Sequence, residues 1–300
     1  MKSKIKIGIL GGDMRQTVLA SFFDSDSVEC AIWGSESTTP DVGSKNIVRT
    51  LDWKSALNGA KAVILPLPVT TDGVRLNCVN NIHSSNMYIP RITEIIEETS
   101  PETLVFGGKL TRSMIRFGDE HKVKLIDYYE SEEFQIKNSV PTAEGAIAVA
   151  IREMNITLSG SKVAIVGYGR IGRTLALRLR ALGANVTCIA RSKKDLAWSE
   201  CDGCSPFKLN KYLEKPMRFD IIFNTVPHVI FDRETIQRLP RNQIFIDLAS
   251  LGGGIDHEAA EIYGIKTVKA LSLPGKCSPV TAAKIIYDSV KEVLTEEKIL

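Results

Sequence analysis

Val163-Ala164-Ile165-Val166-Gly167-Tyr168-Gly169-Arg170-Ile171-Gly172 is the stretch that decides the fold. Its first half has the apolar pattern of a buried strand, and its second half is G-x-G-x-x-G at the start of an amphipathic helix. Gly167 permits a tight turn, Gly169 lets the backbone approach a pyrophosphate, and Gly172 lets the helix pack closely on the strand. The helix N-terminus then faces the phosphate charge. The stretch therefore predicts a dinucleotide site, with Arg170 and Ile171 in the first turn of its helix.

The next apolar run, residues 186–190, ends in Arg191-Ser192-Lys193. A cofactor with a free ribose 2′-hydroxyl usually meets an Asp or Glu at this place, and none stands there. A guanidinium, a hydroxyl and an ammonium group suit a 2′-phosphate, so the sequence favours NADP over NAD. The alternative is that Arg191 stacks on the adenine while the lysines stay solvated.

Two later strand ends are expected to line the nicotinamide side of the same site, because ligands of open parallel sheets bind beyond the carboxyl ends of the strands. They are Asn224-Thr225-Val226-Pro227 and the stretch that begins at Asp247. Ordinary turn chemistry also explains Asn224 and Thr225. Three glycines at 252–254 either let backbone approach a ligand or form a flexible turn.

Ten short apolar runs alternate with helical segments along the chain, which is typical of parallel strands joined by helical crossovers. They cover residues 5–10, 29–33, 62–67, 103–106, 123–126, 162–166, 185–190, 220–224, 243–248 and 267–270. Ten strands are too many for one ordinary sheet. The pattern therefore predicts an α/β protein with two doubly wound, Rossmann-like domains that flank a cleft.

The domain boundary is expected at Pro141, which suits the first position of a helix, with Glu144 in the first turn. That helix would link residues 1–140 to a cofactor domain of residues 141–278. The last helical segment, Thr281–Leu294, comes too late to join the second sheet. It is expected to pack on the first domain, which would then be discontinuous and include about residues 279–300.

The first domain does not repeat the fingerprint, because Gly11-Gly12-Asp13-x-Arg15-Gln16 lacks the third glycine. Asp13 is placed to cap a helix with Arg15 in its first turn. A helix N-terminus and an arginine together form an anion site, and a purely structural cap explains the residues equally well. Thr70 and Thr71 follow another strand end of this domain.

Composition excludes several classes of protein. Of 300 residues, 44% are hydrophobic and 24% charged, and the net charge is +3, which argues against a disordered chain and against nucleic-acid binding. No apolar run approaches the roughly 20 residues of a membrane span, and no signal-peptide pattern opens the chain. Six scattered cysteines then indicate free thiols in a reducing cytoplasm. Cys201-x-x-Cys204 lacks a second pair, so no metal is expected.

Several segments together resemble the family of dipicolinate synthase A-subunits. They are Gly11 to Gln16, Leu65-Pro66, Asn138 to Gly145, Gly167 to Gly172, Ala190 to Ser192, Asn224 to Pro227, Asp247 to Ser250 and Leu273 to Gly275. The resemblance covers essentially the whole chain and implies a fold similar to the D-2-hydroxyacid and alanine dehydrogenases. It also implies work in the mother cell of spore-forming bacteria, where a flavoprotein, the dipicolinate synthase B-subunit, would hold the FMN. The product would be dipicolinate (pyridine-2,6-dicarboxylate), made from a dihydro- or hydroxytetrahydro-dicarboxylate.

Aromatising such a ring removes a hydride and a proton, so the chain would have to hold two carboxylates and accept a proton. Candidates for the carboxylates are the Asp13–Arg15 loop and the hydroxyls of Thr70, Thr71, Ser139 and Thr142. Glu144 is a candidate proton acceptor, or only a helix cap.

Two alternatives to this reaction stay open. A D-2-hydroxyacid-type dehydrogenase usually has a catalytic His near the last strand, and residues 271–280 contain none. A non-catalytic, NADP-binding protein that only assembles with the flavoprotein is the other alternative. A homodimer is expected only by analogy with two-domain dehydrogenases.

Overall fold

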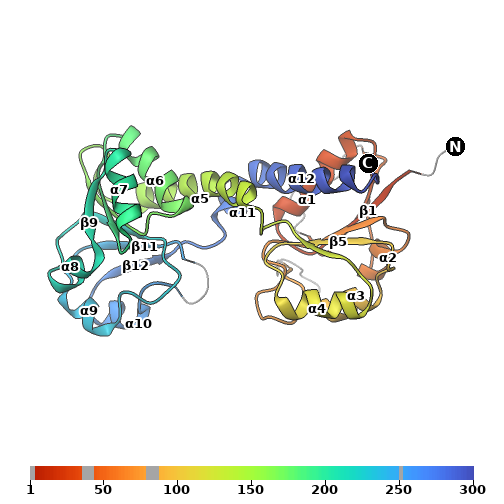
Figure 1. The fold of residues 1–300 in the computed structure, drawn as a ribbon, viewed down its shortest axis with the longest axis horizontal. Coiled ribbons are helices and arrows are strands. Elements are labelled where there is room, and N and C mark those ends of the chain that lie inside the picture. Colours follow the sequence, from red (N-terminus) through yellow and green to blue (C-terminus); the bar gives the residue numbers. More distant parts are fainter. Residues whose placement is uncertain (1–3, 36–43, 79–87, 250–252) are drawn as a thin grey trace. The chain divides into compact units, whose positions relative to one another are not determined.

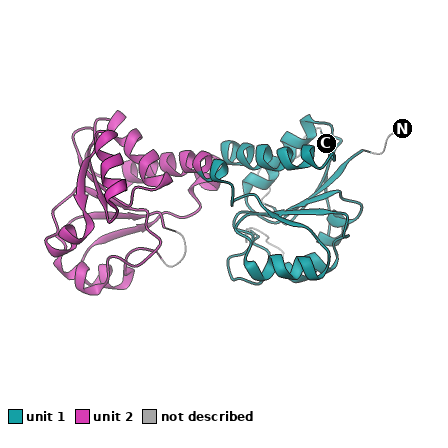
Figure 2. Ribbon diagram, viewed as in Figure 1, with its two compact units in different colours: residues 1–135, 279–300 teal, residues 136–278 magenta. Residues whose placement is uncertain are grey.

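The computed structural model describes residues 4–35, 44–78, 88–249 and 253–300. The chain divides into two compact units, unit 1 of Met1–Gln135 with Pro279–Leu300 and unit 2 of Ile136–Ser278 (Figure 2). Each unit is built on its own six-stranded parallel sheet with helices on both faces. The prediction of an α/β protein with two doubly wound, Rossmann-like lobes is therefore confirmed.

The sheet of unit 1 has the strand order β3-β2-β1-β4-β5-β6 (Figure 1). Its strands are β1 (Lys6–Leu10), β2 (Glu29–Trp33), β3 (Ile47–Arg49), β4 (Ala62–Ile64), β5 (Leu104–Gly107) and β6 (Leu125–Asp127). Its helices are α1 (Met14–Ser25), α2 (Trp53–Leu57), α3 (Ile92–Glu97), α4 (Arg112–Glu120) and α12 (Pro279–Glu296). Ile9 of β1 lies opposite Ile32 and Ile64, so the central strands are apolar on both faces.

Two apolar cores cover the two faces of this sheet. Phe23 of α1 and Ile286 of α12 belong to one core, and Trp53 of α2 and Ile95 of α3 belong to the other. The last helix thus belongs to unit 1, although it follows the whole of unit 2 in the sequence. Tyr287 of α12 packs edge-on against Phe23 and donates a hydrogen bond to Asp26.

The sheet of unit 2 has the strand order β12-β11-β10-β7-β8-β9. Its strands are β7 (Lys162–Val166), β8 (Asn185–Ala190), β9 (Ser205–Lys208), β10 (Ile221–Asn224), β11 (Ile244–Asp247) and β12 (Lys266–Lys269). Its helices are α6 (Arg170–Ala181), α7 (Lys193–Cys201), α8 (Leu209–Glu214), α9 (Arg233–Arg238), α10 (His257–Ile262) and α11 (Leu273–Cys277), with α5 (Glu132–Glu153) leading in from unit 1. At the strand ends Asn224 lies opposite both Val166 and Asp247, which brings three loops together.

The helix expected to begin at Pro141 begins nine residues earlier, at Glu132, so that expectation is wrong. Ser131 accepts a hydrogen bond from the backbone N–H of Phe134, and Glu132 and Glu133 stand in the first turn, as a helix start requires. Pro141 lies inside the helix, where it removes one backbone donor without ending the helix. The division into units falls after Gln135, close to the boundary expected after residue 140.

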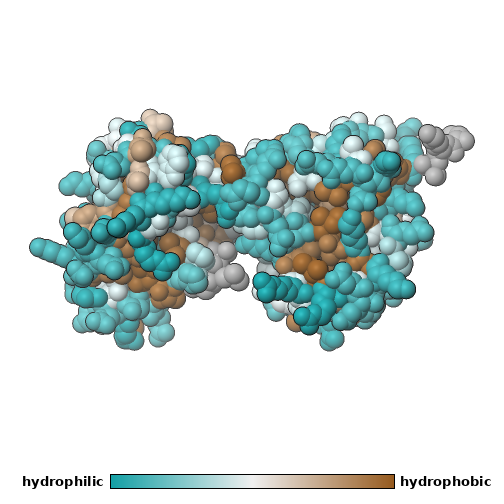
Figure 3. Space-filling view, viewed as in Figure 1, coloured by the Kyte–Doolittle hydropathy of each residue, from teal (hydrophilic) through white to brown (hydrophobic). Residues whose placement is uncertain are grey.

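In the described part of the chain no helix is long and apolar enough to cross a membrane. On the face of the molecule drawn in Figure 3, hydrophilic side chains cover much of both units, with smaller apolar areas among them.

Candidate functional site

The turn between β7 and α6 has the geometry that its three glycines predict. Gly167 has φ +92°, and a Cβ there would lie 2.5 Å from Thr225 Oγ1. A Cβ on Gly172 would lie 2.3 Å from the carbonyl oxygen of Gly167, so helix and turn are in direct contact. Gly169 is the N-cap of α6, has open space beside it, and provides no side chain to cap the helix. The N-cap thus makes no side-chain hydrogen bond to the start of α6, and a helix start of this kind suits a phosphate.

A cavity of about 230 Å³ opens beside this turn, at the carboxyl ends of β7 and β8. Four residues predicted from the sequence line it, namely Gly167, Arg191, Ser192 and Val226. Its other lining residues are Val166, Ile189, Ala190, Asp195, Leu209, His228 and Ile230. The apolar members can enclose a flat ring such as adenine. Three of the polar members, Arg191, Ser192 and Asp195, lie close together in the sequence, and His228 is the fourth.

Asp195 is a lining residue that was not predicted from the sequence. It stands three residues after Ser192, whose hydroxyl caps α7 by accepting from the N–H of Asp195 at 3.4 Å. Ser-x-x-Asp is a recognisable helix-start pattern, so its place near Arg191 could have been inferred. Lys193, which was expected to contact the cofactor, is exposed and is not among the lining residues.

A buried polar network joins the ends of β10 and β11. Asn224 Nδ2 donates to Asp247 Oδ1 at 2.9 Å and to the carbonyl of Val226 at 3.0 Å. Asp247 also accepts from the N–H groups of Ala249 (3.1 Å) and Gly254 (3.0 Å). Asn224 and Asp247 are almost fully buried, so their side chains hold the loops that follow these strands and leave no free donor for a ligand.

The glycines after β11 approach this network closely. A Cβ on Gly254 would lie 2.0 Å from Asn224 Nδ2, and one on Gly253, which has φ +76°, would lie 2.5 Å from Asp247 Oδ2. The close approach proposed for these glycines is therefore to the protein's own side chains. Gly252 and Ser250 lie outside the described residues.

His257, at the start of α10, was not singled out from the sequence and belongs to the same network. Its Nδ1 lies 2.9 Å from Thr267 Oγ1, and its Nε2 lies 3.6 Å from Asp247 Oδ2, beyond hydrogen-bond distance. Burial, together with the positive charge of Lys269, lowers the pKa of His257, although Asp247 and Asp256 act in the opposite direction. The approach of His257 to Asp247 could be found only in the fold, because the two residues are ten positions apart and belong to different elements.

Tyr168, between the first two glycines, holds the turn in place through a hydrogen bond of its side chain. Its buried hydroxyl donates to Asp202 at 2.9 Å, and Arg173 of α6 pairs with the same carboxylate at 2.8 Å. Asp202 lies within Cys201-x-x-Cys204, which gives that motif a structural role. No group of metal-binding side chains occurs among the described residues.

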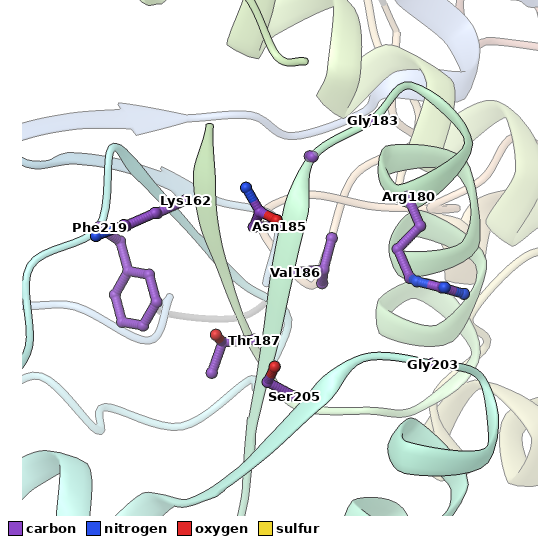
Figure 4. A pocket seen from close by; sticks show the side chains of 10 residues that line it. Lys162, Arg180, Gly183, Asn185, Val186, Thr187, Gly203, Ser205 and Phe219 are labelled. Carbon is purple, nitrogen blue, oxygen red and sulfur yellow. The ribbon is translucent and has the colours of Figure 1, made fainter. Parts of the chain in front are cut away.

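Unit 2 has a second, larger hollow of about 470 Å³ at the opposite ends of its strands (Figure 4). It lies at the amino ends of β7 and β8, around Lys162, Asn185 and Thr187, with Arg180 on α6 beyond them. Cofactors of parallel sheets bind beyond the carboxyl ends, where the backbone N–H groups of the next helix point. The smaller cavity is therefore the candidate dinucleotide site.

The Gly11–Arg15 loop of unit 1 is less open than expected. The N–H groups of Gly11 and Gly12 donate to the carbonyls of Trp33 and Asn77, so they do not form a phosphate cradle. Asp13 caps α1, and Arg15 pairs with it through Nε and Nη2, both at 2.8 Å. Nη2 of Arg15 also donates to the carbonyl of Leu67 at 2.6 Å. Arg15 is thus a buried, internally paired guanidinium.

The remaining predicted residues do not gather at an open helix start. Thr70 accepts and donates within a turn that includes Asp72, and Thr71 is exposed beside it. Ser139 and Thr142 lie inside α5, and their hydroxyls donate to the carbonyls of Ile136 and Asn138. Because α5 begins at Glu132, the helix N-terminus expected near Ser139 and Thr142 does not exist.

Glu144, the candidate proton acceptor, also lies inside α5. Its carboxylate is exposed to solvent and lies 3.3 Å from Nε of Arg178 on α6. The first-turn position expected for it is therefore wrong, because helix α5 has already made three turns before this residue.

Fold and turn together define a protein of the two-lobed, nicotinamide-dinucleotide dehydrogenase class. A family model described as D-isomer specific 2-hydroxyacid dehydrogenase, NAD binding domain, matches residues 135–261. L-alanine dehydrogenase shares the fold, with a TM-score of 0.62 at 14% identity over 97% of this chain and 89% of that one.

Other relatives define the family more narrowly, and two of them match this chain over nearly its whole length. The family model of the N-terminal domain of the dipicolinate synthase A-subunit matches residues 6–129. The dipicolinate synthase A-subunit of Bacillus subtilis (strain 168) is 31% identical over 99% of this chain and 98% of its own length. The crystal structure of the Bacillus halodurans A-subunit superposes with a TM-score of 0.85 at 28% identity, over 98% of this chain and 99% of that one. The chain belongs to the family of dipicolinate synthase A-subunits.

Proposed function

We propose that this chain is an NADP-dependent oxidoreductase that forms pyridine-2,6-dicarboxylate, acting with a flavoprotein B-subunit that holds FMN. The observation that supports this most is the full-length likeness to the dipicolinate synthase A-subunit, in a chain whose β7–α6 turn is built for a dinucleotide. A hydroxytetrahydro-dicarboxylate loses water to give the dihydro ring. The dihydro ring then loses one hydride and one proton as it becomes aromatic. We place this reaction in the mother cell of a sporulating bacterium.

The unit 2 cavity supports the choice of cofactor. When bound, a nicotinamide supplies the acceptor for the hydride. Gly169 and the uncapped start of α6 would hold the pyrophosphate, and Arg191 and Ser192 would hold a 2′-phosphate. Asp195 lines the same cavity, so it is the group that a 2′-phosphate has to avoid. Asn224 and Asp247 fix the loops that end β10 and β11.

The residues outside this cavity take different roles in the proposal. Glu144 is the proposed proton acceptor, because its carboxylate is exposed and lies as far as 3.3 Å from Arg178 Nε. Arg15 and Asp13 hold the Gly11–Arg15 loop in shape for the dicarboxylate. Thr71 is exposed and available to a carboxylate, while Thr70 shapes its turn. Ser139 and Thr142 hold α5, because their hydroxyls already donate to its carbonyls.

The test follows the absorbance band of the pyridine product, with the dihydro-dicarboxylate generated in situ and NADP added. The assay is run with this chain alone, with the flavoprotein alone and with both together. The band should grow fastest with both proteins. No band in any combination, from a chain that still binds NADP, would indicate a non-catalytic protein that only assembles with the flavoprotein. Reduction of NADP by a D-2-hydroxy acid in place of the dihydro-dicarboxylate would indicate the hydroxyacid dehydrogenase.

A further inference from the structure

Gln16, in the first turn of α1, is a buried amide with no hydrogen-bond partner among the residues that the structure describes. The residue is 1% exposed, and within those residues neither its Nε2 nor its Oε1 has a partner. A buried polar group left unpaired costs roughly 1–3 kcal/mol, and buried amides in folded proteins are nearly always satisfied. An amide at this place therefore lowers stability in the free protein, which calls for an explanation.

Gln243 of unit 2 is a second buried glutamine, and its amide is hydrogen-bonded. It is also fully buried, and its Oε1 accepts from the N–H of Phe219 at 2.9 Å while its Nε2 donates to the carbonyl of Pro240 at 3.0 Å. The two glutamines are matched in chemistry and burial and differ in pairing. Gln243 is a structural amide, and Gln16 is not.

The location of Gln16 is the second observation. In the sheet of unit 1 the strand order turns back between β1 and β4, and ligands of such sheets bind beyond the carboxyl ends at that point. Gln16 lies there: a Cβ on Gly12, just after β1, would be 2.5 Å from its Cγ and 3.0 Å from Pro66 Cβ, just after β4. The amide thus lies at the switch point, one residue after the fixed Arg15–Asp13 pair.

We propose that Gln16 is the specificity-determining residue of unit 1, and that its amide binds an acid with an N–H or O–H donor next to its carboxylate. The amide N–H₂ would donate to the carboxylate, and the amide oxygen would accept from the neighbouring donor. The carboxylate in this ligand class rests on the proposed function, whose substrates are ring dicarboxylates. Arg15 and Asp13 are then positioning residues, which keep the first turn of α1 in place around Gln16.

The first test measures stability and uses the matched glutamine as its control. Gln16→Met removes an unpaired amide at similar volume and should raise the thermal unfolding temperature by about 2–4 °C. Gln243→Met breaks two hydrogen bonds and should lower it by at least as much. A Gln16→Met protein less stable than wild type means that the amide is paired, which overturns the proposal. Gln16→Leu repeats the test with a second apolar side chain.

The second test measures binding to the full-length chain, without turnover. cis-Piperidine-2,6-dicarboxylate and cis-cyclohexane-1,3-dicarboxylate have the same two carboxylates, and only the first has a ring N–H between them. By calorimetry the wild type should bind the piperidine acid about tenfold more tightly, and Gln16→Met should bind both equally. NADP affinity should be the same in both proteins.

The outcomes separate this inference from the proposed function. A wild type that binds the two acids equally, or binds neither, overturns the inference, as does a Gln16→Met protein that keeps the preference. A wild type that shows the preference, which Gln16→Met loses, but forms no pyridine with NADP and the flavoprotein contradicts the proposed function alone.

Discussion

Single residues at the candidate site divide into those proposed to contact a ligand and those that shape the loops around it. The fingerprint glycines could be identified from spacing alone, because each answers a steric need of the turn. The roles of Asn224 and Asp247 could not, because they depend on strand register: the two residues lie opposite each other at the ends of β10 and β11. Side chains expected to face the nicotinamide therefore bond to each other instead.

In the proposed function, the charges at residues 191–195 set the preference for NADP over NAD. Arg191→Asp should weaken NADP binding by about 10- to 100-fold and leave NAD binding nearly unchanged, because it removes a charge-assisted contact and adds a repulsion. Asp195→Asn should strengthen NADP binding. Both are measured by titration with the reduced cofactors, and Arg241→Asp, an exposed site outside the cavity, is the control. Equal affinity of the wild type for NADP and NAD would contradict the assignment.

We expect His257 to make the stability of unit 2 sensitive to pH. Its pKa is lowered in the folded protein, mainly by burial, from an ordinary value near 6.5. As pH falls below about 6.5 the unfolded chain takes up this proton before the folded chain does, so stability falls. His257→Gln should flatten the decline of unfolding temperature between about pH 6.5 and 5. An unchanged slope would show that other groups cause the decline.

Elements of secondary structure can be predicted well where they are buried and poorly where they are not. The central strands are apolar on both faces and stand out in the sequence. The strands β3 and β9 do not, because they lie at sheet edges and are largely exposed or polar; β9 even contains Pro206. The start of α5 is marked by the Ser-Glu-Glu of residues 131–133 rather than by Pro141. A start at Pro141 would also have made Val140 the N-cap, a poor residue for that place.

The corrected start of α5 can be tested with its cap. Ser131→Ala should reduce the free energy of unfolding by about 1 kcal/mol, because the N–H of Phe134 loses its acceptor. Ser21→Ala, on the exposed side of α1, should be neutral or slightly stabilising. Chemical denaturation measures both. No loss in Ser131→Ala would mean that water replaces the cap at no cost.

At the scale of the whole molecule, the sequence predicts two similar lobes, since the strand–helix alternation repeats and only one copy has the three glycines. The structure adds a sixth strand to each sheet, and it places α12 in unit 1, the lobe on which the last helical segment is expected from the sequence to pack. What the sequence could not provide is the pairing state of buried polar groups. Arg15 is neutralised by Asp13, whereas Gln16 next to it has no hydrogen-bond partner in the described part of the chain. Pairing of this kind depends on carbonyls and carboxylates that only the folded chain brings close.

The most direct test of the central claim measures how much NADPH forms for each pyridine ring. The chain and its flavoprotein partner are mixed without oxygen, with NADP and the dihydro-dicarboxylate, and NADPH and pyridine-2,6-dicarboxylate are quantified together. The account predicts one NADPH for each pyridine ring formed, because the hydride leaves to a nicotinamide held at the β7–α6 turn. Pyridine formed at the same rate with no NADPH, and with the electrons on the partner's flavin, would contradict it.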